Sequence, residues 1–304
     1  MNNKSMTALV SAFSRAYHFK NNTVRIFNDN IASSLISDEE YNIISENMSK
    51  GINFFKPDFS GTQEQALRYV VDNYLSPSPL GRAAFCEDLF NSYISYKDIQ
   101  YLIFAAGYDT SAYKQLKNSN NIQFFEIDHP LTALDKKQRL EKSNIKIPNN
   151  THYIEADFTQ NNWFLSLTTN NFFDKSKISF CSLLGLSYYL SVDSFKNMLS
   201  SINSIISKKS LIIFDYPDEN SYTEHAGERA KKQSMLAKGA DESMLASYSF
   251  KDMTNILSEC GFSIYKHLTP TEITDKYFSE YNKHNPLHPM SAFDNVNYCA
   301  AIKE

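Results

Sequence analysis

The chain of 304 residues carries a formal net charge of −4, and 42% of its residues are hydrophobic, a composition typical of globular proteins that argues against disorder. Charges of both signs are interspersed without a basic run, so nucleic acid is not expected as a partner. No apolar segment approaches the ~18 residues that span a bilayer, and the start has no signal-peptide pattern, so we expect a cytoplasmic protein without membrane contact.

The first 95 residues are predicted to be helical. Hydrophobic residues recur at spacings of three and four, as in Leu9, Ala12, Phe13 and Ala16, which is the period of an amphipathic helix. We expect residues 1–95 to form a helical cap on an α/β core over residues 96–304, the two together making a single domain, 1–304.

From residue 96 onward, short apolar runs alternate with stretches long enough to hold a helix. Strands buried on both faces have such continuous apolar runs, so the pattern predicts an α/β fold with a doubly wound, mostly parallel sheet of seven strands and helices on both faces. The runs expected to form parallel strands are IQYLIFAA, IQFFEID, HYIEA, KISFCSLLGL and KSLIIFDY.

The last part of the chain departs from this alternation. FSIYKHL and VNYCAAIK are predicted to form an antiparallel pair at a sheet edge, separated by a long polar loop without a helix signal. Residues 217–247 are charged and helix-favouring, and we expect them to form an insertion over the site after the fifth strand.

The sequence contains no convincing set of metal ligands. His284 and His288 have helical spacing, but the prolines in HNPLHP disfavour a regular helix and no third ligand is near. No C-x-x-C spacing occurs, so we expect four reduced, mostly buried thiols, at Cys86, Cys181, Cys260 and Cys299.

The turn after the first predicted strand reads AAGYDT. In an open parallel sheet the ligand binds beyond the carboxyl ends of the strands, and the first strand-to-helix turn approaches it most closely. Gly107 permits a positive φ, while Ala105 and Ala106 keep the turn small. Small residues also make ordinary tight turns, so the turn alone leaves its role open.

The ends of the next two strands carry groups suited to a nucleoside. Asp128 ends the second strand, where a carboxylate can accept hydrogen bonds from both hydroxyls of a ribose. Glu126 lies on the same face and has the alternative of pairing with a lysine or arginine. Past the third strand, Asp157 can accept from an adenine amino group and Phe158 can cover the base. Neither G-x-G-x-x-G nor a P-loop occurs at this turn, which favours adenosine without a diphosphate.

The motifs GRAAF, AAGYDTSAYK, FFEIDHP, ADF and LLGLSYYL, in this order and spacing, resemble the leucine carboxyl methyltransferase family of enzymes that use S-adenosylmethionine. The resemblance covers nearly the whole chain and is strongest to a bacterial branch that O-methylates polyketide-like small molecules. It implies a small-molecule methyl acceptor. A protein carboxyl methyltransferase and a catalytically idle binding protein are the alternatives.

The resemblance also implies roles for particular residues. Arg82 would reach the carboxylate of the cofactor's methionine moiety, and a guanidinium suits a carboxylate on physical grounds too. Ala105 and Gly107 would lie under that moiety. Asp128 would bind the ribose, and Asp157 with Phe158 the adenine.

Two departures from the family pattern bear on cofactor binding. Ala105 replaces the first glycine of the turn, which is tolerable if its φ is negative. Leu184 stands where the eukaryotic enzymes have a glutamate. A carboxylate acceptor needs no base, whereas a phenol benefits from one within hydrogen-bond reach. No residue is assigned as the base. Four side chains are candidates for a place near the methyl group, although a structural role is the favoured interpretation of each: Tyr113, His129, Tyr189 and His225.

Overall fold

A seven-stranded sheet with the order β3-β2-β1-β4-β5-β7-β6 forms the centre of the chain. The computed structural model describes residues 5–94, 99–114, 122–158, 160, 162–239 and 244–304. The strands are β1 (Ile99–Phe104), β2 (Gln123–Asp128), β3 (Thr151–Glu155), β4 (Ile178–Leu183), β5 (Leu211–Pro217), β6 (Phe262–Leu268) and β7 (Val296–Lys303).

Strands β1 to β5 are parallel, and β7 runs antiparallel between β5 and β6. The chain moves outward from β1 through β2 to β3 and then returns to place β4 on the other side of β1. The order therefore reverses between β1 and β4, which creates a ligand-binding position at the carboxyl ends of these strands. The predicted doubly wound α/β sheet is confirmed.

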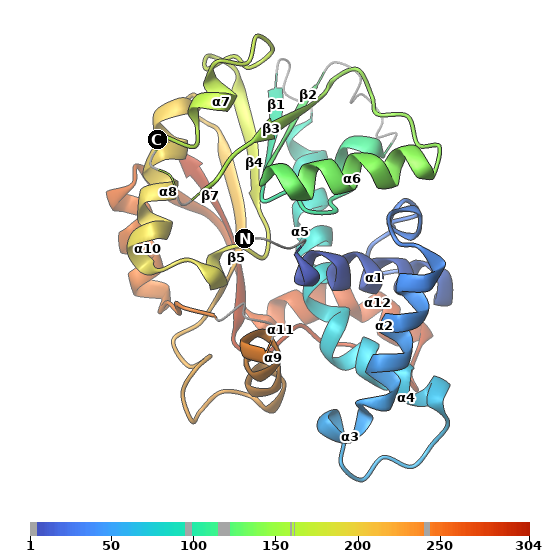
Figure 1. The fold of residues 1–304 in the computed structure, drawn as a ribbon. Helices are drawn as coiled ribbons and strands as arrows, with labels where there is room; N and C mark the ends of the chain where they lie inside the picture. Colours follow the sequence, from blue (N-terminus) through green and yellow to red (C-terminus); the bar gives the residue numbers. More distant parts are fainter. Residues whose placement is uncertain (1–4, 95–98, 115–121, 159, 161, 240–243) are drawn as a thin grey trace.

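The helices that precede the sheet lie together, with α9 beside them (Figure 1). These are α1 (Met6–Asn21), α2 (Asp38–Lys50), α3 (Ile52–Phe55), α4 (Gln63–Val70) and α5 (Pro77–Tyr93), with the 3-10 turn η1 (Ala32–Leu35) and the π-helical turn η2 (Val71–Leu75). The segment predicted to be a helical cap is thus helical where the structure describes it. That this helical cap and the α/β core form a single domain remains a prediction.

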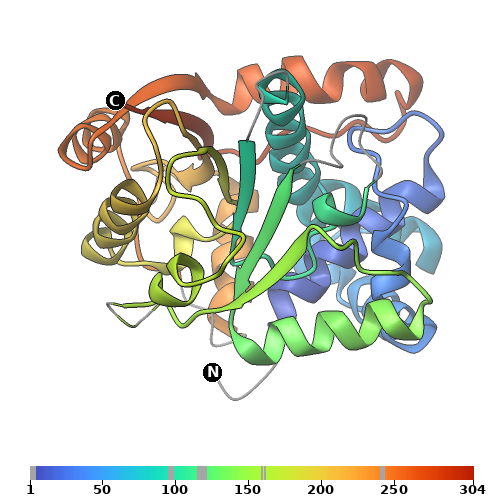
Figure 2. The ribbon, with the colours of Figure 1, turned by 90° about the horizontal axis from the view of Figure 1, so that it is seen from above.

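Helices cover both faces of the sheet (Figures 1 and 2). Tyr101 and Phe124 face the side of α1 and α5, in one hydrophobic core, whereas Leu102 and Phe125 face the side of α8 and α10, in another. The remaining helices are α6 (Pro130–Lys142), α7 (Leu165–Thr168), α8 (Val192–Ile205), α9 (Glu228–Gly239) and α10 (Phe250–Glu259), with the 3-10 turns η3 (Ser111–Tyr113) and η5 (Ser187–Tyr189). Burial on both faces explains the continuous apolar runs of the central strands.

The connection between β6 and β7 corrects one prediction. Residues expected to form a polar loop contain α11 (Pro270–Ile273), the π-helical turn η6 (Thr274–Phe278) and α12 (Ser279–His284). Thr269 accepts from the backbone N–H of Glu272, and the Glu272 carboxylate accepts from the Thr269 backbone N–H. This reciprocal capping, with Pro270 in the first helical position, is readable in the sequence TPTE and was the overlooked signal.

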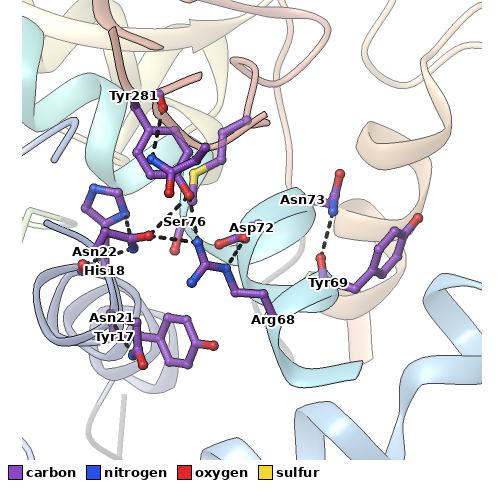
Figure 3. A network of polar contacts seen from close by, with 12 residues as sticks. Tyr17, His18, Asn21, Asn22, Arg68, Tyr69, Asp72, Asn73, Ser76 and Tyr281 are labelled. Atoms are coloured by element: carbon purple, nitrogen blue, oxygen red, sulfur yellow. Dashed lines mark hydrogen bonds and ion pairs between the residues drawn. The ribbon is translucent and has the colours of Figure 1, made fainter. Parts of the chain in front are cut away.

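A buried polar network joins the N-terminal helices to α12 (Figure 3). Arg68 on α4 forms an ion pair with Asp72 and donates to Asn22 at 2.7 Å and to the hydroxyl of Tyr281 at 2.8 Å. Asn22 also contacts His18 at 3.2 Å, and burial together with the charge of Arg68 lowers the pKa of His18 to about 3. The network therefore fixes α1 against α4 and α12 without a charged histidine.

Asp72→Asn is expected to change how stability depends on pH. Burial raises the pKa of Asp72 from 3.8 to about 6 despite Arg68. The stabilisation that protonated Asp72 contributes is complete below its pKa in the unfolded chain, 3.8, and is lost as the pH rises through its folded-state pKa of about 6. As the pH falls from 7 to 5, the free energy of unfolding of the wild type should increase by about 1 kcal/mol relative to that of Asp72→Asn. Urea unfolding of both proteins across this range measures it, and a constant difference would contradict the prediction.

All four cysteines are buried and unpaired, as predicted. Within the described residues, no helix combines the length and the apolar character that a membrane span requires.

Candidate active site

The turn after β1 adopts a left-handed backbone at two positions. Gly107 has a φ of +49°, as its residue type permits, and Ala105 has a φ of +50°. The condition under which alanine was expected to be tolerated here, a negative φ, is therefore not met. The next four residues form a turn that is closed by a hydrogen bond from the Asp109 N–H to the Ala106 carbonyl at 2.7 Å. Ala105, which leads into this turn, has a conformation that favours glycine.

Ala105→Gly is expected to stabilise the protein by about 0.5–1 kcal/mol. The left-handed conformation costs a residue with a Cβ about 1–2 kcal/mol, part of which is offset by the greater freedom of glycine in the unfolded chain. Ala106→Gly is the matched control, because Ala106 does not have a positive φ, and it should destabilise by about 0.5–1 kcal/mol. Urea unfolding measures both, and equal shifts of the same sign would refute the strain at Ala105.

Asp128 connects the end of β2 to the turn after β1. Its Oδ2 accepts from the Gly107 N–H at 2.5 Å, and its Oδ1 accepts from the His129 N–H at 2.6 Å. Burial raises the pKa of Asp128, while these two backbone N–H groups oppose the rise. Each carboxylate oxygen has a second lone pair, so the side chain can still accept from the two hydroxyls of a ribose.

The end of β3 lies beside the end of β2. The Ala156 N–H donates to the Asp128 carbonyl at 2.9 Å, which places the following Asp157 and Phe158 next to the same edge of the sheet. Asp157 is exposed and Phe158 is half-buried, with its ring 5.3 Å from that of Trp163 between centroids. The structure thus brings the ends of β1, β2 and β3 together, as the sequence predicted.

Arg82 reaches the neighbouring strand ends from α5. Pro77 and Pro79 precede it in the first turn of α5, where proline is tolerated. The guanidinium donates from Nη1 to Asp215 at 3.4 Å and lies directly against Gly185. Among the described residues this is the guanidinium's one hydrogen-bond partner, so further N–H groups are available for a carboxylate ligand.

Asp215, at the end of β5, was not identified from the sequence. It is fully buried, and its carboxylate accepts from the Gly185 N–H at 2.6 Å and the Tyr188 hydroxyl at 2.8 Å, besides Arg82. It therefore orients Arg82 at the ends of β4 and β5. The signal was the acid near the end of LIIFDY, since Asp128 is likewise an acid at the carboxyl end of its strand.

Helix α1 lies over the turn after β1, and this contact was also missed. A Cβ added to Gly107 would lie 3.3 Å from the Cβ of Ala8. Arg15 donates to the Tyr108 carbonyl at 2.7 Å and pairs with Asp29 at 3.1 Å. Asp29 in turn accepts from the hydroxyl of Thr110 at 2.9 Å. The N-terminal helices therefore enclose this side of the candidate site.

Glu126 follows the alternative interpretation. Its carboxylate pairs with Lys136 of α6 at 2.7 Å, and both side chains are almost completely buried. Tyr113, a candidate neighbour of the methyl group for which a structural role was favoured, is also buried and is hydrogen-bonded to Tyr153. Glu126 and Tyr113 therefore have partners within the protein and serve structural roles.

The histidines proposed for the site are differently placed. His129 is the N-cap of α6, accepting from the Leu131 N–H at 3.3 Å, and so adjoins Asp128. His225 is exposed beside Glu224, and Tyr189 is half-buried in η5. No group of three or more metal-binding side chains is found within the described ranges.

Comparison with known proteins agrees with this arrangement. The sequence pattern of the leucine carboxyl methyltransferase family matches residues 8–203. A Bacillus subtilis protein, YktD, provisionally named an S-adenosyl-L-methionine-dependent methyltransferase, is 35% identical over 308 residues, which cover 100% of this chain and 99% of YktD. A crystal structure from Thermobifida fusca, provisionally identified as a methyltransferase, is 11% identical with a TM-score of 0.53 and covers 99% of this chain and 96% of that chain, which supports the fold alone. The chain therefore belongs to the leucine carboxyl methyltransferase family, whose cofactor is S-adenosylmethionine.

Proposed function

We propose that the protein is an O-methyltransferase that transfers a methyl group from S-adenosylmethionine to a carboxylate or hydroxyl oxygen of a small molecule. The observation that carries the proposal is that the turn after β1, Asp128 and the end of β3 lie side by side at one edge of the sheet, next to the point where the strand order reverses. One adenosine can contact all three at such a position.

The assignment of binding residues follows from this convergence. Asp128 holds the ribose, and Asp157 with Phe158 receives the adenine. Gly107 and Ala105 lie under the methionine moiety. Arg82, oriented by Asp215 at 3.4 Å, binds the methionine carboxylate with its remaining N–H groups.

When bound, S-adenosylmethionine supplies a methyl group whose bond to sulfur breaks, with the electron pair remaining on sulfur, as a bond to the acceptor oxygen forms. The protein's part is to orient the acceptor in line and to exclude water. A carboxylate acceptor releases no proton, whereas a hydroxyl acceptor releases one to a base or to solvent. We assign no residue as the base.

The enclosure of the turn by α1 supports a small acceptor. Ala8 and Arg15 contact the turn after β1 from above, which leaves less room for an extended peptide than an open groove would. This favours a small molecule over the carboxyl terminus of a protein.

Methyl transfer from isotope-labelled S-adenosylmethionine tests the proposal. The wild type is incubated with a panel of small carboxylic acids and phenols, and in parallel with a peptide that ends in leucine. Label in a small-molecule ester or ether supports the proposal. Label in the peptide alone would replace it with protein carboxyl methylation. Cofactor binding by calorimetry without transfer to any member of an exhaustive panel would favour an idle binding protein.

A further inference from the structure

A pocket lies between α1, α5 and the turn after β1. Side chains of mixed character line it, including Arg15, Ala83, Glu87, Asp109, Thr110 and Leu184. It adjoins the candidate cofactor site, because its lining includes Ala83, next to Arg82 on α5, and Asp109, two residues after Gly107. The pocket is therefore next to the place assigned to the methionine moiety.

The charges that line this pocket do not balance. Arg15 is neutralised by Asp29 at 3.1 Å, and Glu87 by Lys114 at 2.6 Å. Asp109 is half-buried and has no ion pair with any residue that the structure describes. One net negative charge thus remains in a partly enclosed space, where an uncompensated charge is costly and a cationic ligand is favoured.

The hydrogen bonds of Asp109 leave acceptor capacity. Its Oδ1 accepts from the Ser111 N–H at 2.7 Å, and a carboxylate offers about four acceptor positions on its two oxygens. An ammonium group carries three donors, which suits this arrangement.

The position of the pocket indicates which cation fits. Arg82, next to Ala83 on α5, is assigned to the carboxylate of the methionine moiety, and the α-ammonium group of that moiety is attached to the same carbon atom as the carboxylate. Leu184 gives the pocket an apolar wall, so Asp109 is its unpaired charged group among the residues that the structure describes. We propose that Asp109 binds the α-ammonium group of the cofactor's methionine moiety, while Arg82 binds its carboxylate. This inference rests on the proposed binding of S-adenosylmethionine.

Calorimetry with three ligands tests this assignment. S-Adenosylhomocysteine carries both the ammonium and the carboxylate, its deaminated analogue carries only the carboxylate, and methylthioadenosine carries neither. Asp109→Asn keeps an oxygen for the Ser111 N–H but removes the charge. We expect it to bind S-adenosylhomocysteine about 10-fold or more weakly, as loss of a charge-assisted hydrogen bond implies, with unchanged affinity for the other two ligands.

Glu87→Gln is the matched control, because Glu87 lines the same pocket but is already paired with Lys114. It should alter the affinity for S-adenosylhomocysteine less than Asp109→Asn does. Equal affinity of Asp109→Asn and wild type for S-adenosylhomocysteine would overturn the inference, and so would an equal loss for all three ligands. Wild type that binds none of the three would instead refute the proposed function.

Discussion

Asp128→Ala is expected to weaken the binding of S-adenosylmethionine by about 2–4 kcal/mol, or roughly 30- to 1000-fold, because two charge-assisted hydrogen bonds to the ribose are lost. The substitution also removes the acceptor for the Gly107 N–H at 2.5 Å, which loosens the turn that contacts the ligand. Calorimetry with S-adenosylmethionine and with methylthioadenosine measures the loss. Both ligands should be affected, since both contain the ribose.

Glu141→Ala is the control for this substitution. Glu141 is an exposed carboxylate near the end of α6, and its removal should leave the affinity unchanged. Asp128→Ala that folds normally and binds S-adenosylmethionine as tightly as the control would refute the ribose assignment.

Lys136→Met is expected to destabilise the protein by about 3–5 kcal/mol, because it leaves the buried carboxylate of Glu126 without its partner. Nζ of Lys136 lies 2.7 Å from Oε2 of Glu126, and both side chains are almost fully buried. The double substitution Glu126→Leu with Lys136→Met removes both charges and should recover most of the loss. Urea unfolding gives the free energy for each variant.

The loss in Lys136→Met should also depend on pH. Burial raises the pKa of Glu126 above 4.5, and Lys136 counteracts the rise. Without Lys136, the pKa of Glu126 in the folded protein rises further. The stabilisation that protonated Glu126 contributes is therefore complete below the unfolded-state pKa of 4.5, and it is lost as the pH increases through the folded-state pKa. The loss of folding free energy in Lys136→Met should therefore be smaller at pH 5 than at pH 8. Lys142→Met, at an exposed position of α6, should change stability by less than about 0.5 kcal/mol at either pH. A deficit that does not vary with pH would show that Glu126 remains ionised, or that its burial is incomplete.

The sheet could be predicted because its signals are local. Every residue of β1 is buried. Its sequence, IQYLIF, is hydrophobic except for Gln100 and lies between turn signals, so the burial on both faces can be recognised in the sequence. Gly107 and Asp128 could be placed at one site by the general rule that parallel strands end at a common edge. Their direct hydrogen bond at 2.5 Å agrees with that rule.

Other parts of the site depend on contacts that no local pattern records. Arg15 contacts the carbonyl of Tyr108 across 93 positions of sequence, and helical periodicity alone does not distinguish it from a surface arginine. Asp215 has the same strand-end position as Asp128, but its partners come from α5 and from the turn after β4. The left-handed φ of Ala105 likewise could not be predicted, because alanine disfavours this conformation.

A crystal structure with S-adenosylhomocysteine tests the central claim most directly. The nucleoside is expected beyond the ends of β1, β2 and β3, with its ribose hydroxyls on Asp128, its adenine beside Asp157 and its amino-acid end over Gly107. A ligand bound elsewhere, or one that contacts only a single strand end, would contradict the account.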